Sequence, residues 1–421
     1  MMRLHQTVAI LTAFVTLMGG LIFSGLAQTN TRTKAISGAG KAALSSHLSS
    51  AVSRGDSPGV VALIVGRDGV LYQGAAGKLD IAHDTAMPAN AIFAIASMTK
   101  PVTSVAIMRL VEEGQVKLDD PVSAYLPGFD HLQVITRFNE KDATYETRPA
   151  KRTITIRHLL TNTSGFAYGF CNAIEYRLTE KTKKNPWELP LVNDPGDRWN
   201  YSPSTAVLGM IVEKISGQTL EAYYHQHIFE PLGMVDTSYA VPLAKQSRVP
   251  TTYTRTNGEL KEESRGTIPA TPTPPFRGDG GLYSTVQDYG RFMQMLLNGG
   301  HLGPAKILSE RSVKMMGENN IGSIFVELQP ALEPAHAKPF PLGAGHDKFG
   351  FGFQIASSNP QYAKFRSAGS MSWAGIYNTE FWVDPVQHIG GVMMMQMLPF
   401  YDDGAIRTLR DFEELVYRDL R

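Results

Sequence analysis

The segment "FAIASMTKPVTSVAIM", residues 93–108, holds a serine and a lysine whose types and spacing suit acyl transfer. An apolar extended run ends near Ser97, and from Pro101 onward apolar residues recur at helical spacing. Since residues three apart share a helix face, the Lys100 ammonium is predicted to lie over the Ser97 hydroxyl. Free N–H groups at the helix N-terminus would stabilise a negative oxygen there. The pattern predicts a nucleophilic serine; an ordinary N-cap serine beside a solvated lysine is the alternative.

A serine nucleophile needs a proton acceptor, and none of the eleven histidines stands in a recognisable Ser–His–acid pattern. His225 and His227 in "YYHQHIF" would point apart on a helix, so we interpret them as a surface pair rather than metal ligands. Tyr201, in "PGDRWNYSPS", is the better candidate base. A nearby ammonium such as that of Lys100 would favour its phenolate. Taken alone, Tyr201 would be an ordinary half-buried aromatic residue.

A third segment, "SWAGIYNTEFWVDP", offers a strand along which a substrate could lie. Gly375 permits close backbone approach at the start of this apparent strand. The backbone N–H that follows it, at Ile376, could pair with that of Ser97 as an oxyanion hole. An ordinary strand with an aromatic residue is the alternative interpretation.

The elements that must position these residues have strands at both ends of the chain. Residues 59–77 predict two strands around a turn at 67–69, and residues 378–397 again predict strand, turn and strand. Residues 38–55 predict an amphipathic helix, and residues 405–420 carry one apolar helical face. We therefore expect an α/β (α+β) fold with one antiparallel sheet built from both chain ends and flanked by helices. Its sheet region would span about 40–95 and 340–421, with a mostly helical region, about 96–339, inserted.

Composition and the N-terminus limit the classes of protein further. The 421 residues are 43% hydrophobic with a formal net charge of +1, so nothing indicates nucleic-acid binding. The only cysteine, Cys171, excludes an internal disulfide. A basic start, an apolar run and small residues before Gln28 predict a signal peptide over 1–27, cleaved after Ala27, and a mature lead over 28–39. The expected location is therefore periplasmic or secreted, with an uncleaved membrane anchor as the alternative.

In this order, the three segments resemble the S-x-x-K, Y-x-N and K-T-G signatures of the serine β-lactamase and penicillin-binding-protein superfamily. The resemblance covers about residues 40–418 and includes "ITIRHLLTNTSGF" and "GGLYSTVQDYGRFMQMLLNGG". It is strongest for class C-related serine hydrolases, and among them the family VIII carboxylesterases. It implies a β-lactamase/transpeptidase-like fold.

Carried onto this sequence, the resemblance makes Ser97 the acyl-accepting nucleophile. Lys100 would take or relay its proton and keep Tyr201 acidic, and Tyr201 would act as base and return the proton to the leaving group. Ser97 and Ile376 would supply the oxyanion N–H groups. The substrate-binding K-T-G position is occupied by Trp373, Ala374 and Gly375.

The sequence departs from the family pattern at both substrate-binding motifs. Pro203 replaces the amide-binding asparagine, and Trp373–Ala374 removes the cation and hydroxyl that help hold a substrate carboxylate. Trp373 suits an apolar acyl or alcohol group instead; Arg277 or Lys348 could replace the missing cation. We therefore expect an esterase for small or medium esters, with no cofactor and no metal. The alternatives are a class C-like β-lactamase, a D-amino-acid peptidase, an acyltransferase, or a catalytically silent binding protein.

Overall fold

A computed structural model of the chain describes residues 34–263, 266–358 and 365–421. The predicted signal peptide, 1–27, and residues 28–33 of the predicted lead lie outside the described residues. In the described ranges, no helix combines the length and apolar character needed to cross a membrane.

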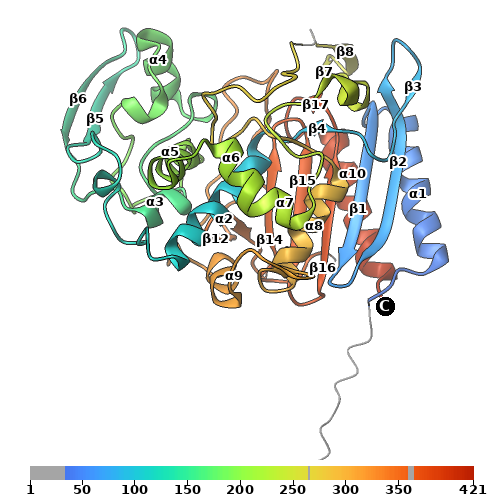
Figure 1. Cartoon of the computed structure of the whole chain (residues 1–421). Helices are drawn as coiled ribbons and strands as arrows, with labels where there is room; N and C mark the ends of the chain where they lie inside the picture. The colour runs from blue at the N-terminus through green and yellow to red at the C-terminus, as the bar shows by residue number, and fades with distance from the viewer. Residues whose placement is uncertain (1–33, 264–265, 359–364) are drawn as a thin grey trace, which may run out of the picture. The chain divides into compact units, whose positions relative to one another are not determined.

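One antiparallel sheet joins strands from both ends of the chain, as predicted (Figure 1). The order is β12-β13-β14-β15-β16-β1-β2-β3, so β1 from the N-terminal part pairs with β16 from the C-terminal part. The bounds are β1 Gly59–Gly66, β2 Val70–Asp80, β3 Thr85–Ala86, β12 Lys348–Phe349, β13 Gln354–Ile355, β14 Met371–Gly375, β15 Thr379–Asp384 and β16 Ile389–Met394. Strand β1 is buried along its whole length, because helices cover both faces of the sheet at its centre.

The two terminal helices, α1 (Gly38–Ser53) and α10 (Asp403–Asp419), pack against each other and against one face of this sheet. Leu409, Phe412 and Val416 of α10 are buried in that layer, as their periodic spacing predicts. The other face carries the larger core, which includes side chains of α2 (Thr99–Glu112), α5 (Ser204–Ser216) and α8 (Val286–Leu297). The predicted fold class is confirmed, with helices on both faces of an antiparallel sheet (Figure 1).

The region between the two halves of the sheet is not helical throughout. Its shorter helices are α3 Ile156–Leu160, α4 Ala173–Thr182, α6 Leu220–Tyr224, α7 Glu230–Leu232 and α9 Glu310–Met316. It also holds pairs of small strands: β4 Phe93–Ala94 with β9 Tyr283–Ser284, β5 Gln133–Asn139 with β6 Thr144–Pro149, β7 Tyr253–Thr256 with β8 Glu259–Glu262, and β10 His301–Leu302 with β11 Ala305–Lys306. A short strand from the C-terminal part of the chain, β17 Met397–Leu398, pairs with β7. We did not expect the β5–β6 hairpin, because its strands are mostly exposed and lack the apolar alternation that marks a half-buried strand.

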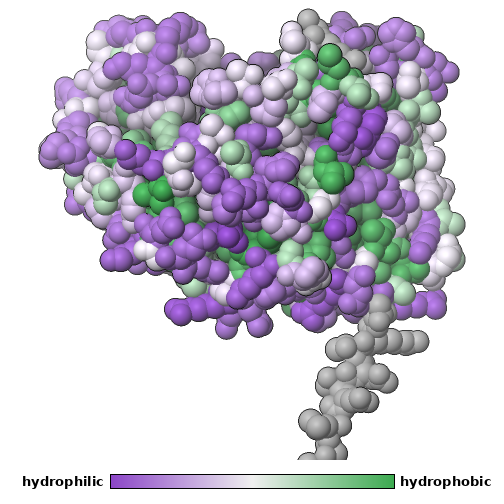
Figure 2. Space-filling model, viewed as in Figure 1, coloured by the Kyte–Doolittle hydropathy of each residue, from purple (hydrophilic) through white to green (hydrophobic). Residues whose placement is uncertain are grey.

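Polar side chains cover most of the face drawn in Figure 2, and apolar side chains gather there in small separate groups. This agrees with the interspersed charges and near-zero net charge of the sequence.

Candidate active site

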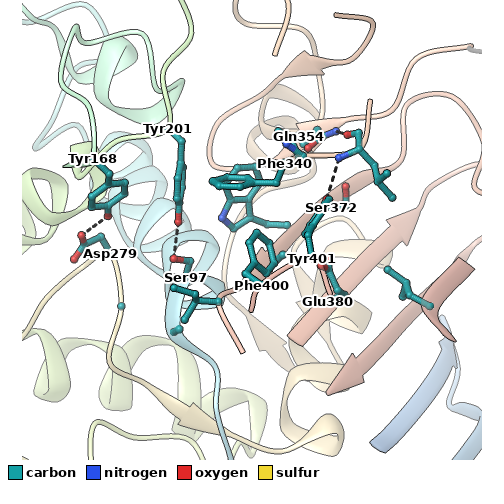
Figure 3. A pocket seen from close by; sticks show the side chains of 18 of the residues that line it. Ser97, Tyr168, Tyr201, Asp279, Phe340, Gln354, Ser372, Glu380, Phe400 and Tyr401 are labelled. Carbon is teal, nitrogen blue, oxygen red and sulfur yellow. Dashed lines mark hydrogen bonds between the residues drawn. The ribbon is translucent and has the colours of Figure 1, made fainter. Parts of the chain in front are cut away.

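Ser97, Lys100 and Tyr201 meet at one point in the structure. The Lys100 ammonium donates a hydrogen bond of 3.0 Å to Ser97 Oγ. The Tyr201 hydroxyl donates one of 2.5 Å to the same oxygen, and Figure 3 shows this second bond. Tyr201 stands just before α5, 104 positions from Ser97 in the chain. The arrangement places two groups that can exchange protons beside one hydroxyl oxygen, and a serine nucleophile requires such a neighbour to accept its proton.

A tight turn at the start of α2 fixes Ser97 in this position. Ala96–Met98 form a single 3₁₀ turn that runs directly into the helix, so Lys100 stands one turn after Ser97. Ala96 has a φ of 42°, in the left-handed region that residues with a Cβ rarely adopt. Such local strain persists only where the surrounding structure enforces it. Here the Ile95 N–H donates to Leu282 O, which ties the turn to a neighbouring segment.

Sequence reasoning missed the groups that hold Lys100. The Lys100 ammonium also donates to the backbone oxygen of Asp279, at 2.7 Å and 179 positions away in the chain. The buried Asp279 carboxylate accepts hydrogen bonds from the Tyr168 hydroxyl and, at 2.9 and 2.7 Å, from the Arg277 guanidinium. The only local signal was the loop "RGDGG" before β9, which gave no reason to connect it with Ser97.

Burial perturbs the acidity of both proton-transfer candidates. Burial of the 3%-exposed Lys100 lowers the pKa of its ammonium to about 8, against an opposing effect from the Asp279 carboxylate. Burial raises the pKa of the Tyr201 phenol, although its hydrogen bond to Ser97 acts in the opposite direction. The expectation that the Lys100 charge keeps the pKa of Tyr201 low is therefore not met, because desolvation of the buried phenol has the largest effect on that pKa. At neutral pH, Lys100 is therefore the group closer to exchanging its proton.

Strand β14 ends directly against the turn that carries Ser97. A Cβ on Gly375 would overlap with the Ile95 carbonyl oxygen, so only glycine allows this approach of the two backbones. Beyond Gly375, the Ile376 backbone N–H donates no hydrogen bond to any other residue in the part of the chain that the structure describes. Strand β14 pairs with β13 only at Met371 and Ser372, so the edge from Trp373 to Gly375 is unpaired by β13. These features match the predicted place for an oxyanion donor and a substrate strand.

A pocket of about 440 Å³ opens beside Ser97 (Figure 3). Trp373, Ala374 and Ile376 line it together with a group of aromatic residues, Tyr168, Phe170, Phe340, Phe400 and Tyr401. Charged residues line other parts of it, among them Arg277, Asp279, Arg366, Glu380, Arg410 and Glu413. The Trp373 ring lies 5.4 Å from the Tyr201 ring, centroid to centroid. The position at which the resemblance would place a cation therefore contributes an apolar wall.

The two cations that could replace the missing lysine do not supply a free charge. Arg277 lines the pocket, but its guanidinium is paired with the Asp279 carboxylate. Lys348 does not line the pocket; its ammonium donates to Gly322 O and Ile324 O and lies 3.6 Å from the Phe325 ring centre. A substrate carboxylate would find no unpaired partner at either residue.

The residues around Pro203, where the family pattern has an asparagine, have a structural role. The Ser202 hydroxyl donates to the buried Asn162 side chain at 2.9 Å and lies 2.7 Å from the Ser204 hydroxyl. Pro203 begins α5 without a side-chain cap. Asn162 and Ser202 thus support the backbone around Tyr201 through a buried polar network.

The other candidates of the sequence lie outside the pocket or have no chemical partner. His225 is exposed, 3.8 Å from Glu230, and the His227 ring packs 4.4 Å from that of Tyr223. No group of three or more His, Cys, Asp or Glu side chains within the described ranges is arranged to hold a metal ion. Cys171 is buried beside the backbone of Tyr201, and burial raises the pKa of its thiol to about 12.

Comparison with known proteins agrees with this geometry. The Beta-lactamase family model matches residues 44–415. An uncharacterized protein of Mycobacterium tuberculosis is 33% identical over 356 residues, covering 81% of this chain and 86% of that protein. A monacolin J acid methylbutanoyltransferase of Aspergillus terreus is 27% identical over 355 residues, covering 77% and 81%. The esterase EstB of Burkholderia gladioli is 27% identical over 366 residues, covering 77% and 82%.

A solved structure shares the fold. Unliganded simvastatin synthase (LovD) from Aspergillus terreus superposes with a TM-score of 0.75 at 24% identity, covering 90% of this chain and 98% of that one. The family match spans nearly all of the region that forms the sheet, the helices and the Ser97 pocket. The chain belongs to the beta-lactamase family, and its relatives within that fold include esterases and acyltransferases.

Proposed function

We propose that the protein hydrolyses small or medium carboxylic esters through an acyl-enzyme on Ser97. The observation that carries this proposal is the hydrogen-bonded Ser97–Lys100–Tyr201 group beside a pocket in which Trp373 stands where the family pattern has a lysine. A carboxylate-bearing β-lactam or peptide would meet an indole there instead of a cation, and dehydrating a charge without a partner is costly. A neutral ester has no such requirement.

The geometry supports the following sequence of proton transfers. The uncharged fraction of Lys100 accepts the Ser97 proton as Ser97 Oγ bonds to the ester carbonyl carbon, and the Ser97 and Ile376 N–H groups bind the oxyanion. The bond to the alkoxy oxygen then breaks. The proton reaches the departing alkoxide from Lys100 through the Tyr201 hydroxyl, which contacts the same serine oxygen. Water attacks the acyl group, its proton returns by the same route, and Ser97 is restored.

A direct comparison of substrates tests this proposal. Losing a charged hydrogen bond costs roughly 1.5 to 3 kcal/mol, which is about one to two orders of magnitude in rate. An alkoxide also leaves more readily than an amine. We therefore expect kcat/KM for a short p-nitrophenyl ester to exceed that for the cephalosporin nitrocefin by at least about a hundredfold. Equal turnover of nitrocefin and ester would replace the esterase proposal with the β-lactamase alternative.

Acyl transfer to an alcohol is the second candidate function. It is favoured by the similarity to a fungal methylbutanoyltransferase across 77% of this chain. An acyl-enzyme does not by itself fix its acceptor, so an alcohol bound in the pocket would compete with water. Adding a medium-chain alcohol during ester turnover and measuring the new ester by mass spectrometry separates transfer from hydrolysis. A product ratio that merely follows the solution concentrations of alcohol and water would favour the hydrolase.

A further inference from the structure

The pocket contains a buried acid that the proposed reaction does not use. Glu380 of β15 lines the pocket, and its Oε1 is buried without a hydrogen-bond partner among the described residues. Figure 3 places it on the sheet side of the pocket, across from Ser97 and Tyr201. Strand β15 has a second acidic residue, Asp384, but that residue stands at the end of the strand, whereas Glu380 is followed by the apolar run Phe381–Val383.

Sheet register fixes where this carboxyl group points. Glu380 stands directly opposite Ala374 of β14, and opposite residues of an antiparallel pair project to the same face. The neighbouring pair on that face is Ser372 and Trp382, and Trp382 packs in the layer formed with α1 and α10. Glu380 therefore lies where the pocket extends from the edge of β14 toward α10.

Among the described residues, the charged groups around this end of the pocket form no hydrogen bond with Glu380 Oε1. The Arg366 guanidinium donates hydrogen bonds of 2.8 Å to both carboxylate oxygens of Glu413, so these two charges neutralise each other. Both residues, with Arg410, also line the pocket. Burial raises the pKa of the Glu380 carboxyl to about 8, with Arg366 acting in the opposite direction and Glu413 reinforcing it. Glu380 is thus mostly uncharged at neutral pH.

An unsatisfied carboxyl group in the pocket wall is unfavourable for binding a plain alkyl chain. Leaving a buried polar group unpaired costs free energy, whereas a bound hydroxyl would satisfy it. A substrate ammonium is disfavoured by the Arg410 guanidinium and by the missing negative charge on Glu380. A hydroxyl can donate to or accept from a protonated carboxyl group.

Strand geometry separates Glu380 from the oxyanion donor. Ala374 is two residues before Ile376, and Glu380 lies one strand further across the sheet. Two residues along a strand and one inter-strand spacing place the Glu380 and Ile376 Cα atoms roughly 8 Å apart. Because the Glu380 side chain projects toward α10, a substrate chain must pass around the edge of β14 to reach its carboxyl group.

We propose that Glu380 determines specificity by hydrogen-bonding a hydroxyl group on the part of the substrate chain that reaches the α10 side of the pocket. The inference rests on the proposed esterase function and names the substrate class for that same pocket. It concerns a substrate chain that is mainly apolar and carries a single hydroxyl, on either the acyl or the alcohol side of the ester. Glu380 is a binding residue here and takes no part in proton transfer at Ser97.

The test compares paired esters that differ by one hydroxyl. Wild-type protein is assayed with p-nitrophenyl alkanoates of hexanoate length and longer against their ω-hydroxy counterparts, and with the corresponding alkyl acetates against their ω-hydroxyalkyl counterparts. We expect the hydroxylated member of one pair to have a kcat/KM about tenfold higher. Glu380→Leu should abolish that preference by slowing the hydroxylated ester and accelerating the plain one. Glu259→Leu, which removes an exposed acid on β8, is the matched control and should keep the wild-type preference.

Each outcome has a defined meaning. If the plain esters are hydrolysed as fast as their hydroxylated partners in every pair, this inference is wrong and the esterase proposal stands. If no ester is hydrolysed, the proposed function itself fails. A preference that survives in folded Glu380→Leu or Glu380→Ala, or a stronger preference for an ω-amino ester, also overturns the inference. Since the first comparison uses wild-type protein, the inference can fail even if neither variant folds.

Discussion

Replacement of Tyr201 by phenylalanine removes a single oxygen from the centre of the proposed proton path. That oxygen lies 2.5 Å from Ser97 Oγ, and Ser97 is its hydrogen-bond partner in the structure. The ring would keep its packing, because its neighbours Tyr168, Trp373 and Phe340 lie 4.9 to 5.5 Å away, centroid to centroid. Loss of a positioned proton donor typically lowers a rate by about 10² to 10⁴. We therefore expect Tyr201→Phe to lower kcat/KM about a thousandfold, equivalent to about 4 kcal/mol of transition-state stabilisation.

The assay is steady-state hydrolysis of a short p-nitrophenyl ester, with thermal unfolding measured in parallel. Tyr72→Phe is the matched control, because Tyr72 is also a buried tyrosine but hydrogen-bonds Ser45 in the layer with α1 and α10. Both variants should unfold within a few degrees of the wild type, since one hydrogen bond contributes only about 1 kcal/mol. Near wild-type turnover by Tyr201→Phe would refute the reasoning and leave Tyr201 a packing residue. So would an additive loss in the double variant with Lys100→Ala, because residues of one proton-transfer unit are strongly non-additive.

Three further predictions follow from the site and from the N-terminus. Because burial lowers the pKa of Lys100 to about 8 and its uncharged form is the acceptor, kcat/KM should rise with pH through about 8; a profile that falls across this range would exclude Lys100 as the base. Gly375→Ala should abolish activity, because the new methyl group overlaps with the Ile95 carbonyl oxygen and displaces β14 from Ser97, and unchanged turnover would show that this close approach is not needed. We propose that residues 1–27 are an export signal, so mass analysis of the exported protein should find Gln28 at its N-terminus; full-length chain in the membrane fraction would favour an anchor.

The sheet could be predicted because its strands carry strong local signals. The continuous apolar run of β1 and the turn before β2 are visible in the sequence, as is the helical face of α10. The β5–β6 hairpin was missed since exposed strands show no burial pattern. Sequence periodicity reports burial, so elements that bury little stay hidden.

In the candidate site, contacts between residues close in the sequence could be predicted, and contacts between distant segments could not. The Ser97–Lys100 hydrogen bond spans three residues within one helical turn and follows from spacing. The contact of Lys100 with Asp279 joins segments 179 positions apart, and no local pattern connects them. The sequence also could not predict that the pKa of Tyr201 is raised, because this shift depends on how deeply the fold buries the phenol. Glu380 was visible only as an acid in a largely apolar strand, with nothing to indicate which cavity it faces.

The central claim is that Ser97 carries the acyl group, and trapping that intermediate tests it most directly. The wild-type protein is reacted with a slowly turned-over ester or a fluorophosphonate, and peptide mass spectrometry locates the added mass. We predict one adduct, on the peptide that contains Ser97, and no labelling or ester hydrolysis by Ser97→Ala. An adduct on another serine, together with ester hydrolysis by Ser97→Ala, would contradict it.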